Sequence, residues 1–321
     1  MADTVPAASR IARAGGPAIA IGAMAVVLAL APLVGLYPVF LMKALWFALF
    51  ACAFNLLIGF GGLLSFGHAM FLGTAGYVCA HAAKEWGWPP EAAILLGTGA
   101  SAALGVVAGV VAIRRQGIYF AMITLALAQM VFFFYLQTPF THGEDGIQSV
   151  PRGMLFGVLD LRSTLVMYYV VLAIFLAAFL LIYRVIHSPF GQVLKAIREN
   201  EPRATSLGYD IDRYKLLAFI LSAALAGLAG ATKAIVFQLA SLTDVHWTMS
   251  GEVVLMTLLG GMGTIFGPVV GAFVIIGLES YLAAFGQWVT VITGAIFVVC
   301  VLAFRRGIVG EIGAWWAKRA G

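Results

Sequence analysis

The sequence has very few charged residues for its length. Of 321 residues, only 10% are Asp, Glu, Lys or Arg, and 62% are hydrophobic, whereas soluble domains carry about 25% charged residues. A water-soluble fold of this composition would leave large apolar patches in contact with water. The scarcity of charge therefore excludes an ordinary soluble domain and indicates that lipid surrounds most of the chain.

Several motifs of catalysis and metal binding are also absent. The sequence has no phosphate-binding loop of the pattern G-x-x-x-x-G-K-[ST], no H-E-x-x-H motif and no pair of catalytic carboxylates. The three cysteines, Cys52, Cys79 and Cys300, all lie in apolar stretches, where a buried thiol is expected rather than a disulfide or a metal ligand. The sequence predicts neither an enzyme nor a metal site.

What the sequence does contain is a series of long apolar runs. A bilayer core about 30 Å thick needs about 20 apolar residues for each helical crossing. Runs that can supply such crossings are 17–36, 40–60, 63–82, 92–113, 118–136, 164–183, 216–237, 253–285 and 289–304. We expect an all-α polytopic membrane protein of about nine to ten transmembrane helices, with broken or re-entrant Gly-rich segments, in a single domain spanning 1–321.

The run 253–285 is too long for one crossing and too short for two. It contains the break Gly260-Gly261-Met262-Gly263, which predicts a short helix, a Gly-rich turn at membrane depth and a returning helix. Irregular backbone inside a bilayer must be enclosed by protein or face a water-filled cavity. We therefore expect this break inside the protein.

Lys and Arg are unevenly distributed between the two ends of the runs. If the N-terminus is cytoplasmic, most of them fall on the cytoplasmic side, as the excess of positive charge in cytoplasmic loops requires. On this map, residues 1–16 and 305–321 are cytoplasmic tails and 186–213 is a cytoplasmic loop. The net charge of +5 thus reflects membrane orientation, and no nucleic-acid partner is expected.

The cytoplasmic loop carries signals for two short helices. Ser188 can cap the free N–H groups of a helix that begins at Pro189. Pro202 predicts a break near Glu201, because proline cannot continue a helix. Gly208 can end the second helix.

The first of these two helices is amphipathic, with Phe190, Leu194 and Ile197 on one face. An ordinary solvated loop can show this pattern, and so can a surface helix that docks on a partner protein. The pattern by itself leaves both interpretations open.

Four blocks of sequence resemble the LivM-type permeases of ABC importers for branched-chain amino acids, the LivHM family. Residues 55–69 fit the pattern N-L-L-x-G-x-G-G-x-x-S-x-G-H-A, and residues 259–268 read L-G-G-M-G-T-x-x-G-P. The others lie within 117–130 and in the cytoplasmic loop, which resembles the family's coupling loop. The blocks are ordered over nearly the whole chain.

This resemblance implies a transport subunit rather than an enzyme. It implies the inner membrane of a bacterium, a second permease of the LivH type, two cytoplasmic ATPases that bind ATP and Mg, and a periplasmic binding protein that delivers leucine, isoleucine or valine. No cofactor is expected in this chain itself. Urea, short amides or other amino acids are alternative cargoes. An ion-coupled secondary transporter is the alternative of a different class, which the few acidic residues in the runs disfavour.

The resemblance assigns the cytoplasmic loop to coupling with the ATPases. The candidate coupling residues are Ser188, Pro189, Phe190, Gly191, Ala196, Arg198, Glu199, Asn200, Glu201, Ala204 and Gly208.

Polar and glycine residues in or beside the runs are candidates for lining the translocation route, because polar side chains in a membrane tend to face a bundle interior or a cavity. They are Asn55, Ser65, His68, Thr124, Gln129, Gly260 and Gly261. For His68, Thr124 and Gln129, hydrogen bonding between helices is the alternative role. In the outer loop, Glu144 and Asp145 could contact the binding protein or simply form a solvated turn.

Overall fold

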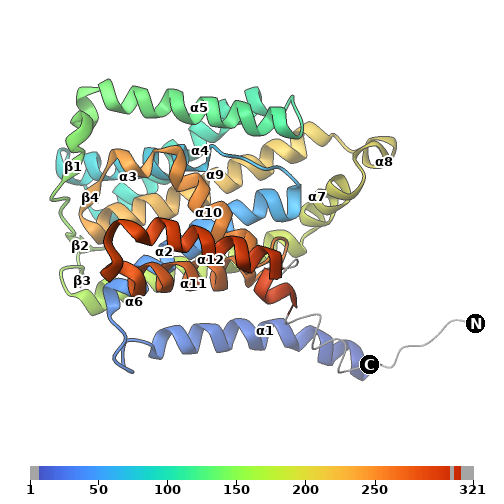
Figure 1. Cartoon of the computed structure of the whole chain (residues 1–321), viewed down its shortest axis with the longest axis horizontal. Coiled ribbons are helices and arrows are strands. Elements are labelled where there is room, and N and C mark those ends of the chain that lie inside the picture. The colour runs from blue at the N-terminus through green and yellow to red at the C-terminus, as the bar shows by residue number, and fades with distance from the viewer. Residues whose placement is uncertain (1–6, 304–306, 312–321) are drawn as a thin grey trace, which may run out of the picture.

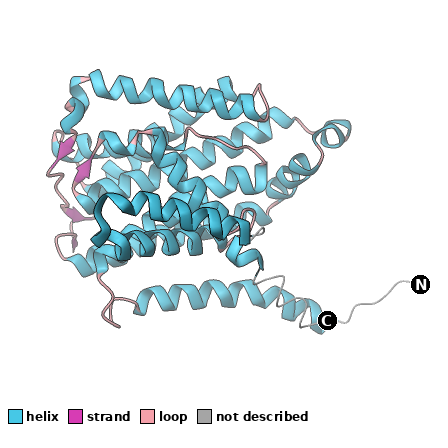
Figure 2. Cartoon of the chain, viewed as in Figure 1, coloured by secondary structure: helices cyan, strands magenta, loops and turns pink. Residues whose placement is uncertain are grey.

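The computed structural model of the protein describes residues 7–303 and 307–311, and this part of the chain is almost entirely helical (Figure 1, Figure 2). Of the twelve α-helices within residues 7–303, ten form a bundle, and α7 (Pro189–Glu199) and α8 (Glu201–Ser206) project from one end. We call α7 and α8 the elbow, and the end that carries them the elbow end. The opposite end carries the short strands and is called the strand end. The all-α architecture of the sequence prediction is confirmed.

The bundle helices alternate in direction between these two ends. They are α1 (Ala7–Leu30), α2 (Pro38–Asn55), α3 (His68–Lys84), α4 (Pro90–Ala112), α5 (Ile118–Gln137), α6 (Thr164–His187), α9 (Ile211–Phe237), α10 (Trp247–Gly260), α11 (Gly267–Leu282) and α12 (Val289–Ala303). The π-helical turn η1 (Leu56–Phe60) continues α2. Within residues 7–303 and 307–311, five helices are long and apolar enough to cross a membrane: α2 with η1, α4, α5, α6 and α9. The chain is therefore a multi-pass membrane protein.

The strand end is closed by short strands and 3-10 turns. β1 (Ile147–Gln148) pairs antiparallel with β4 (Leu239–Ala240), and β2 (Met154–Leu155) pairs with β3 (Leu159–Asp160). The first pairing fixes the long loop after α5 to the end of α9.

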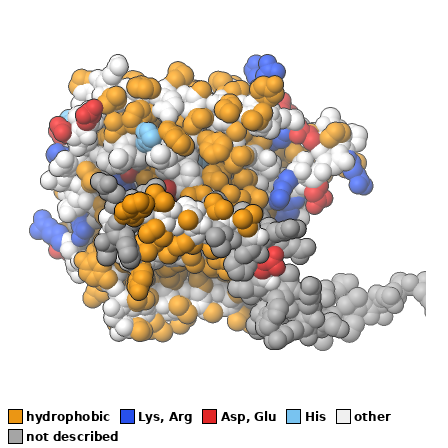
Figure 3. Space-filling view, viewed as in Figure 1, with side chains coloured by type: hydrophobic (Ala, Val, Ile, Leu, Met, Phe, Trp, Pro, Cys, Tyr) orange, Lys and Arg blue, Asp and Glu red, His pale blue; other side chains and the backbone are white. Residues whose placement is uncertain are grey.

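The bundle has α2 at its centre and α5 at its outside. The most apolar window of α2 with η1 is 89% buried, whereas that of α5 is only 28% buried. Hydrophobic side chains accordingly cover much of the face seen in Figure 3. This distribution fits a bundle surrounded by lipid or by another apolar chain.

Glycines allow the helices to approach closely. A Cβ atom at Gly97 of α4 would lie 2.5 Å from the carbonyl oxygen of Ala75 in α3, and one at Gly230 of α9 would overlap the carbonyl oxygen of Leu72. Small residues at such contacts let backbones pack against each other inside a membrane. The position of glycines within the apolar runs is explained by this packing.

Two expected spans have different bounds in the structure. The run 63–82 is not one helix, because residues 62–67 are irregular and α3 begins only at His68. Gly62 has a φ of 71°, a left-handed conformation that ends the preceding helix. The first helix starts at Ala7, within the expected tail 1–16, and ends at Leu30 instead of reaching residue 36. Most of the expected tail 305–321 lies outside the described residues.

The run 253–285 forms a short helix, a Gly-rich turn and a returning helix, as predicted. The turn joins α10 to α11 beside the elbow, with Gly260 and Gly261 buried in the protein, and the chain already enters the protein before α10. Asp244 and Val245, which precede α10, are 5% and 1% exposed. From there the fourteen residues of α10, at about 1.5 Å each, carry the chain to the elbow end.

Candidate functional site

Local signals set the shape of the elbow. The Ser188 hydroxyl accepts a hydrogen bond from the Gly191 N–H at 3.4 Å, and the Asn200 side chain accepts one from the Arg203 N–H at 3.0 Å. Gly208 follows α8 with a φ of 86°. The predicted caps and the predicted break near residue 201 are confirmed.

The elbow is packed on the bundle by one face only. Leu194 and Ile197 of α7 are 0% and 2% exposed, and the Phe190 ring stacks on Tyr214 of α9 with 5.6 Å between centroids. In α8, Ala204 is the buried residue. The amphipathic pattern is therefore used as predicted, and the opposite face remains open to a partner.

Six of the eleven candidate coupling residues are exposed. Pro189, Ala196, Arg198, Glu199, Asn200 and Gly208 are exposed, Ser188, Phe190 and Glu201 are half-buried, and Gly191 and Ala204 are buried. Just after α8, Leu207 is 69% exposed. It is an apolar side chain that the sequence reasoning did not single out.

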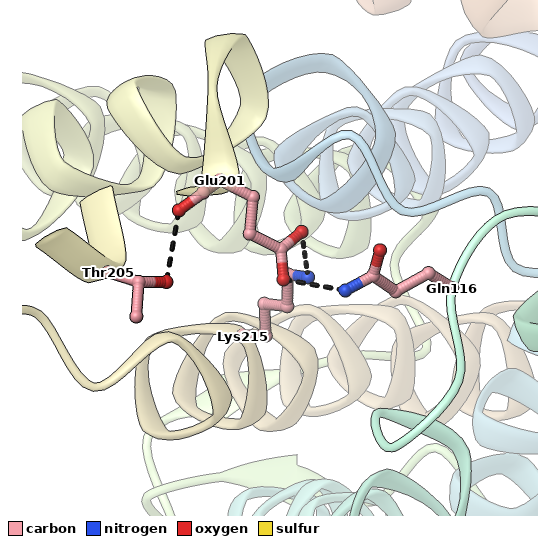
Figure 4. A network of polar contacts seen from close by, with 4 residues as sticks. All are labelled: Gln116, Glu201, Thr205 and Lys215. Atoms are coloured by element: carbon pink, nitrogen blue, oxygen red, sulfur yellow. Dashed lines mark hydrogen bonds and ion pairs between the residues drawn. The ribbon is translucent and has the colours of Figure 1, made fainter. Parts of the chain in front are cut away.

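Two polar anchors tie the elbow to the body of the protein. The Arg198 guanidinium donates to the carbonyl oxygen of Gly59 in η1. The Glu201 carboxylate contacts Lys215 of α9 at 2.8 Å and accepts from the Gln116 side chain at 2.6 Å (Figure 4). The sequence could not show these contacts, because local helix signals act within a few residues, whereas the contact partners are 14, 85 and 139 positions apart along the chain.

Asn55 holds the turn between α10 and α11. Its amide nitrogen donates to the carbonyl oxygen of Thr264, and its amide oxygen accepts from the Gly263 N–H, both at 2.9 Å. Gly261 begins the turn with a φ of 119°, and Gly260 packs against α11. Three of the candidate route residues therefore meet at this turn, with their polar groups or backbone enclosed by protein.

The buried His68 side chain joins two helices. Its Nε2 lies 2.8 Å from the Ser222 hydroxyl, which itself donates to the carbonyl oxygen of Ala53 at 2.6 Å. The Ser222 oxygen can then only accept, so Nε2–H is the donor. The edges of Phe54 and Phe71 enclose the ring, and the side chain is 0% exposed. This geometry is that of a hydrogen bond between helices.

Ser65 and Thr124 satisfy the backbone of the irregular segment before α3. The Ser65 hydroxyl accepts from the Gly67 N–H, and the Thr124 hydroxyl accepts from the Phe66 N–H, each at 3.2 Å. Irregular backbone among apolar helices requires such partners. Gln129, on α5, is half-buried and differs from the other route candidates, which are all buried.

A cavity of about 540 Å³ lies between the irregular segment before α3 and the start of α5. Its walls come from the irregular segment before α3, the start of α5 and the start of α10, and include Gly62, Leu64, Phe66, Gly117 and Trp247. The walls are mostly apolar, with backbone groups of the irregular segment on one side. None of the candidate route residues is among its lining residues.

The acidic pair Glu144 and Asp145 lies at the strand end. Both side chains are exposed on the 3-10 turn η3 (Gly143–Asp145), and acidic side chains are visible at that end in Figure 3. Among the described residues, no group of three or more His, Cys, Asp or Glu is placed to hold a metal ion.

Known proteins are similar in sequence to most of this chain. The model of a family described as the permease component of branched-chain amino acid transport systems matches residues 38–301. The high-affinity branched-chain amino acid transport permease proteins LivM of Salmonella typhimurium and Escherichia coli are 28% and 27% identical to this chain. Each alignment covers 79% of this chain and 65% of the relative.

A probable branched-chain amino acid transport permease protein LivH of Methanocaldococcus jannaschii is 30% identical over 44% of this chain and 46% of its own length. No solved structure matches the chain.

Proposed function

The chain belongs to the family of permease components of branched-chain amino acid transport systems, and from this premise we propose that it is a permease subunit of an ATP-driven importer. The proposed cargo is leucine, isoleucine or valine, moved into the cytoplasm by alternating access. The names of the two LivM relatives support this cargo. So does the apolar wall of the cavity beside α5.

The observation that carries the proposal is the elbow. It is a folded, capped unit that packs on the bundle through one face, exposes the other and ends in the exposed Leu207. We propose that two cytoplasmic ATPases dock on this exposed face and move it when they close on ATP. In this proposal ATP and Mg are bound by the ATPases, and this chain holds no cofactor.

The distribution of basic residues supports a cytoplasmic elbow end. Arg114 and Arg115 adjoin Gln116, which contacts the elbow, and Arg184 and Lys195 lie at the end of α6 and in α7. Basic residues favour the cytoplasmic side of a membrane. We therefore place the chain in a bacterial inner membrane with both tails in the cytoplasm.

At the strand end, Glu144 and Asp145 are proposed to meet a periplasmic binding protein. Their exposure on a turn that β1 and β4 hold in place supports this role.

The route is proposed to pass by the cavity and a second, LivH-type permease. α5 presents a wide exposed apolar face next to this cavity, which a second chain could cover. A branched side chain suits the apolar wall, and the charged groups of an amino acid suit backbone groups of irregular segments. We propose that the candidates Asn55, Ser65, His68, Thr124, Gln129, Gly260 and Gly261 also belong to this route. None of them lines the cavity itself; Gln129 is half-buried and the others are buried.

The transport test uses vesicles that contain the chain with its partner subunits. Labelled leucine should accumulate with ATP and binding protein, and not without ATP. Stronger accumulation of labelled urea than of leucine would make urea the cargo, while the assignment to an ATP-driven importer would stay. Proton-dependent, ATP-independent uptake by this chain alone would overturn the importer assignment in favour of a secondary transporter.

The docking test replaces Leu207 by aspartate. The variant should insert in the membrane but lose stimulation of ATP hydrolysis, because a charge replaces an apolar contact at the elbow. The matched control is Val158→Asp, at a residue that is 82% exposed at the strand end. Equal ATP hydrolysis in wild type and Leu207→Asp would contradict the docking role.

A further inference from the structure

Lys215 is a buried cation at the elbow end. It lies in the second turn of α9 and is 3% exposed. Burial of an ammonium group is costly unless an opposite charge compensates it. The compensating group is Glu201, whose Oε2 is 2.8 Å from the Lys215 Nζ.

The same carboxylate reaches a third part of the chain. Its other oxygen accepts from the Gln116 Nε2 at 2.6 Å, and Gln116 lies in the turn between α4 and α5. Glu201 is itself the first residue of α8, and its carbonyl oxygen accepts from the Thr205 hydroxyl at 3.1 Å. One side chain therefore connects α8, α9 and the start of α5 (Figure 4). We call Gln116, Glu201 and Lys215 the joint.

The contacts of the joint are the principal polar contacts between α8 and the bundle. Apart from the joint, α8 buries only the small side chain of Ala204. The neighbouring anchor, Arg198, reaches η1 instead, through the carbonyl of Gly59. Arg198 thus connects α7 to η1, and Glu201 connects α8 to α9 and to the turn before α5.

Both anchors lead to the walls of the cavity beside α5. Gly117, the residue after Gln116, lines that cavity on one side, and Gly62, just after η1, lines it on another. If the elbow tilts, Glu201 would therefore displace the cavity wall at Gly117, and Arg198 would displace the wall at Gly62.

We propose that Glu201 is a positioning residue that transmits motion of the elbow to α9 and to the start of α5. The proposal rests on the proposed function, because the partner ATPases supply the motion. It assigns the Glu201 carboxylate to contacts within this chain, and not to contact with the ATPase. Its negative charge is needed, because a neutral acceptor would leave the Lys215 charge uncompensated.

The first experiment measures the coupling inside the chain without any partner. Spin labels are placed at Ser206 in α8 and Arg115 before α5, both exposed, in full-length chain whose cysteines have been replaced, in nanodiscs. Glu201→Gln should broaden the distribution of label distances, because α8 loses its hold. The control is Asp210→Asn, which removes an exposed ion pair with Arg213 and should leave the distribution unchanged. A narrow, wild-type distribution in Glu201→Gln would overturn the proposal, whatever the chain transports.

The second experiment compares leucine uptake per ATP hydrolysed in the reconstituted importer. Glu201→Gln should keep the ATPases bound and active, while uptake per ATP falls about tenfold, as expected for the loss of a coupling contact. The reversed pair Glu201→Lys with Lys215→Glu should recover much of that loss, since Gln116 can accept as well as donate. Loss of ATPase binding in Glu201→Gln would show a direct contact and refute the assignment.

A milder variant guards against misfolding. Gln116 is exposed, so Gln116→Ala should fold normally and lower uptake per ATP about threefold by removing one hydrogen bond. An unchanged ratio in this variant would refute transmission to α5. If wild type itself shows no ATP-driven uptake, the proposed function fails, while the label distances still decide whether Glu201 holds the elbow.

Discussion

Replacing Asn55 by alanine should free the turn between α10 and α11 and destabilise the protein. The Asn55 side chain is 3% exposed and serves the Gly263 N–H and the Thr264 carbonyl, both at 2.9 Å. Alanine can serve neither. Leaving one buried polar group without a partner costs about 1–3 kcal/mol, so the free energy of unfolding should fall by about 2–5 kcal/mol for the two groups.

A one-atom change at the same position gives a sharper test. Asn55→Asp keeps the oxygen that accepts from Gly263 but replaces the donor to Thr264 by a second oxygen. Two acceptors then face each other, and a charge is added in a buried place. We expect Asn55→Asp to be at least as unstable as Asn55→Ala, although its size and shape are almost those of the natural residue.

Stability would be measured by titrating the protein in mixed micelles with a denaturing detergent and following its helix content. The control is Gln129→Ala, at a half-buried position on α5, which should change the free energy of unfolding by less than about 0.5 kcal/mol. If Asn55→Asp unfolds at the wild-type detergent fraction, the Asn55 amide does not hold the turn and the reasoning is refuted.

Two further predictions use the same titration. Gly97→Ala should destabilise the protein by about 1–3 kcal/mol, because the new Cβ would lie 2.5 Å from the Ala75 carbonyl oxygen. The control, Gly99→Ala, lies in the same helix with no atom within 4 Å and should be neutral or stabilising by up to about 1 kcal/mol. Equal effects of the two substitutions would refute the close-packing account. Lys233→Ala should cost about 3–5 kcal/mol, because it leaves Asp244 buried without its ion-pair partner. The double variant Lys233→Met with Asp244→Leu should cost less, and a larger loss in the double variant would contradict this explanation.

The elbow could be predicted from the sequence because its signals are local. Ser188 caps a helix whose first N–H groups lie within three residues, Pro202 acts on the turn before it, and Gly208 supplies a left-handed conformation at its own position. Each signal acts within a few residues. The sequence therefore showed the shape of the elbow, although it did not show Arg198 and Glu201 as anchors to distant segments.

The contacts that hold the Gly-rich breaks could not be predicted, because they join distant residues. The turn after α10 is held by Asn55, more than two hundred residues earlier in the chain. Runs of glycine show that the backbone can break, but hydropathy does not show which side chain will satisfy the broken backbone. The sequence therefore predicted a break at Gly260-Gly261-Met262-Gly263, but not the side chain that holds it.

The candidate route residues illustrate a second limit of sequence reasoning. A polar side chain in a membrane helix needs a partner, whether it lines a route or joins two helices. His68 and Thr124 therefore looked alike in the sequence to residues that face a cavity. In the structure both are buried and hydrogen-bonded within the protein, whereas Gln129 is half-exposed on α5.

The breaks converge on the elbow, and this convergence has a mechanical consequence. Arg198 binds the π-helical turn η1 through Gly59, and a Cβ atom at Gly59 would lie 2.7 Å from the backbone nitrogen of Gly263 in the turn after α10. The elbow is thus joined to places where the regular helical hydrogen-bond ladder is interrupted, and π-helical turns of this kind often occur at functional sites. Under the proposed function, a force on the elbow would act through Arg198 on η1, whereas the adjoining helix α2 is enclosed by packed side chains. Under the proposed function, the irregular segment that forms one wall of the cavity would therefore move before the helices behind it do.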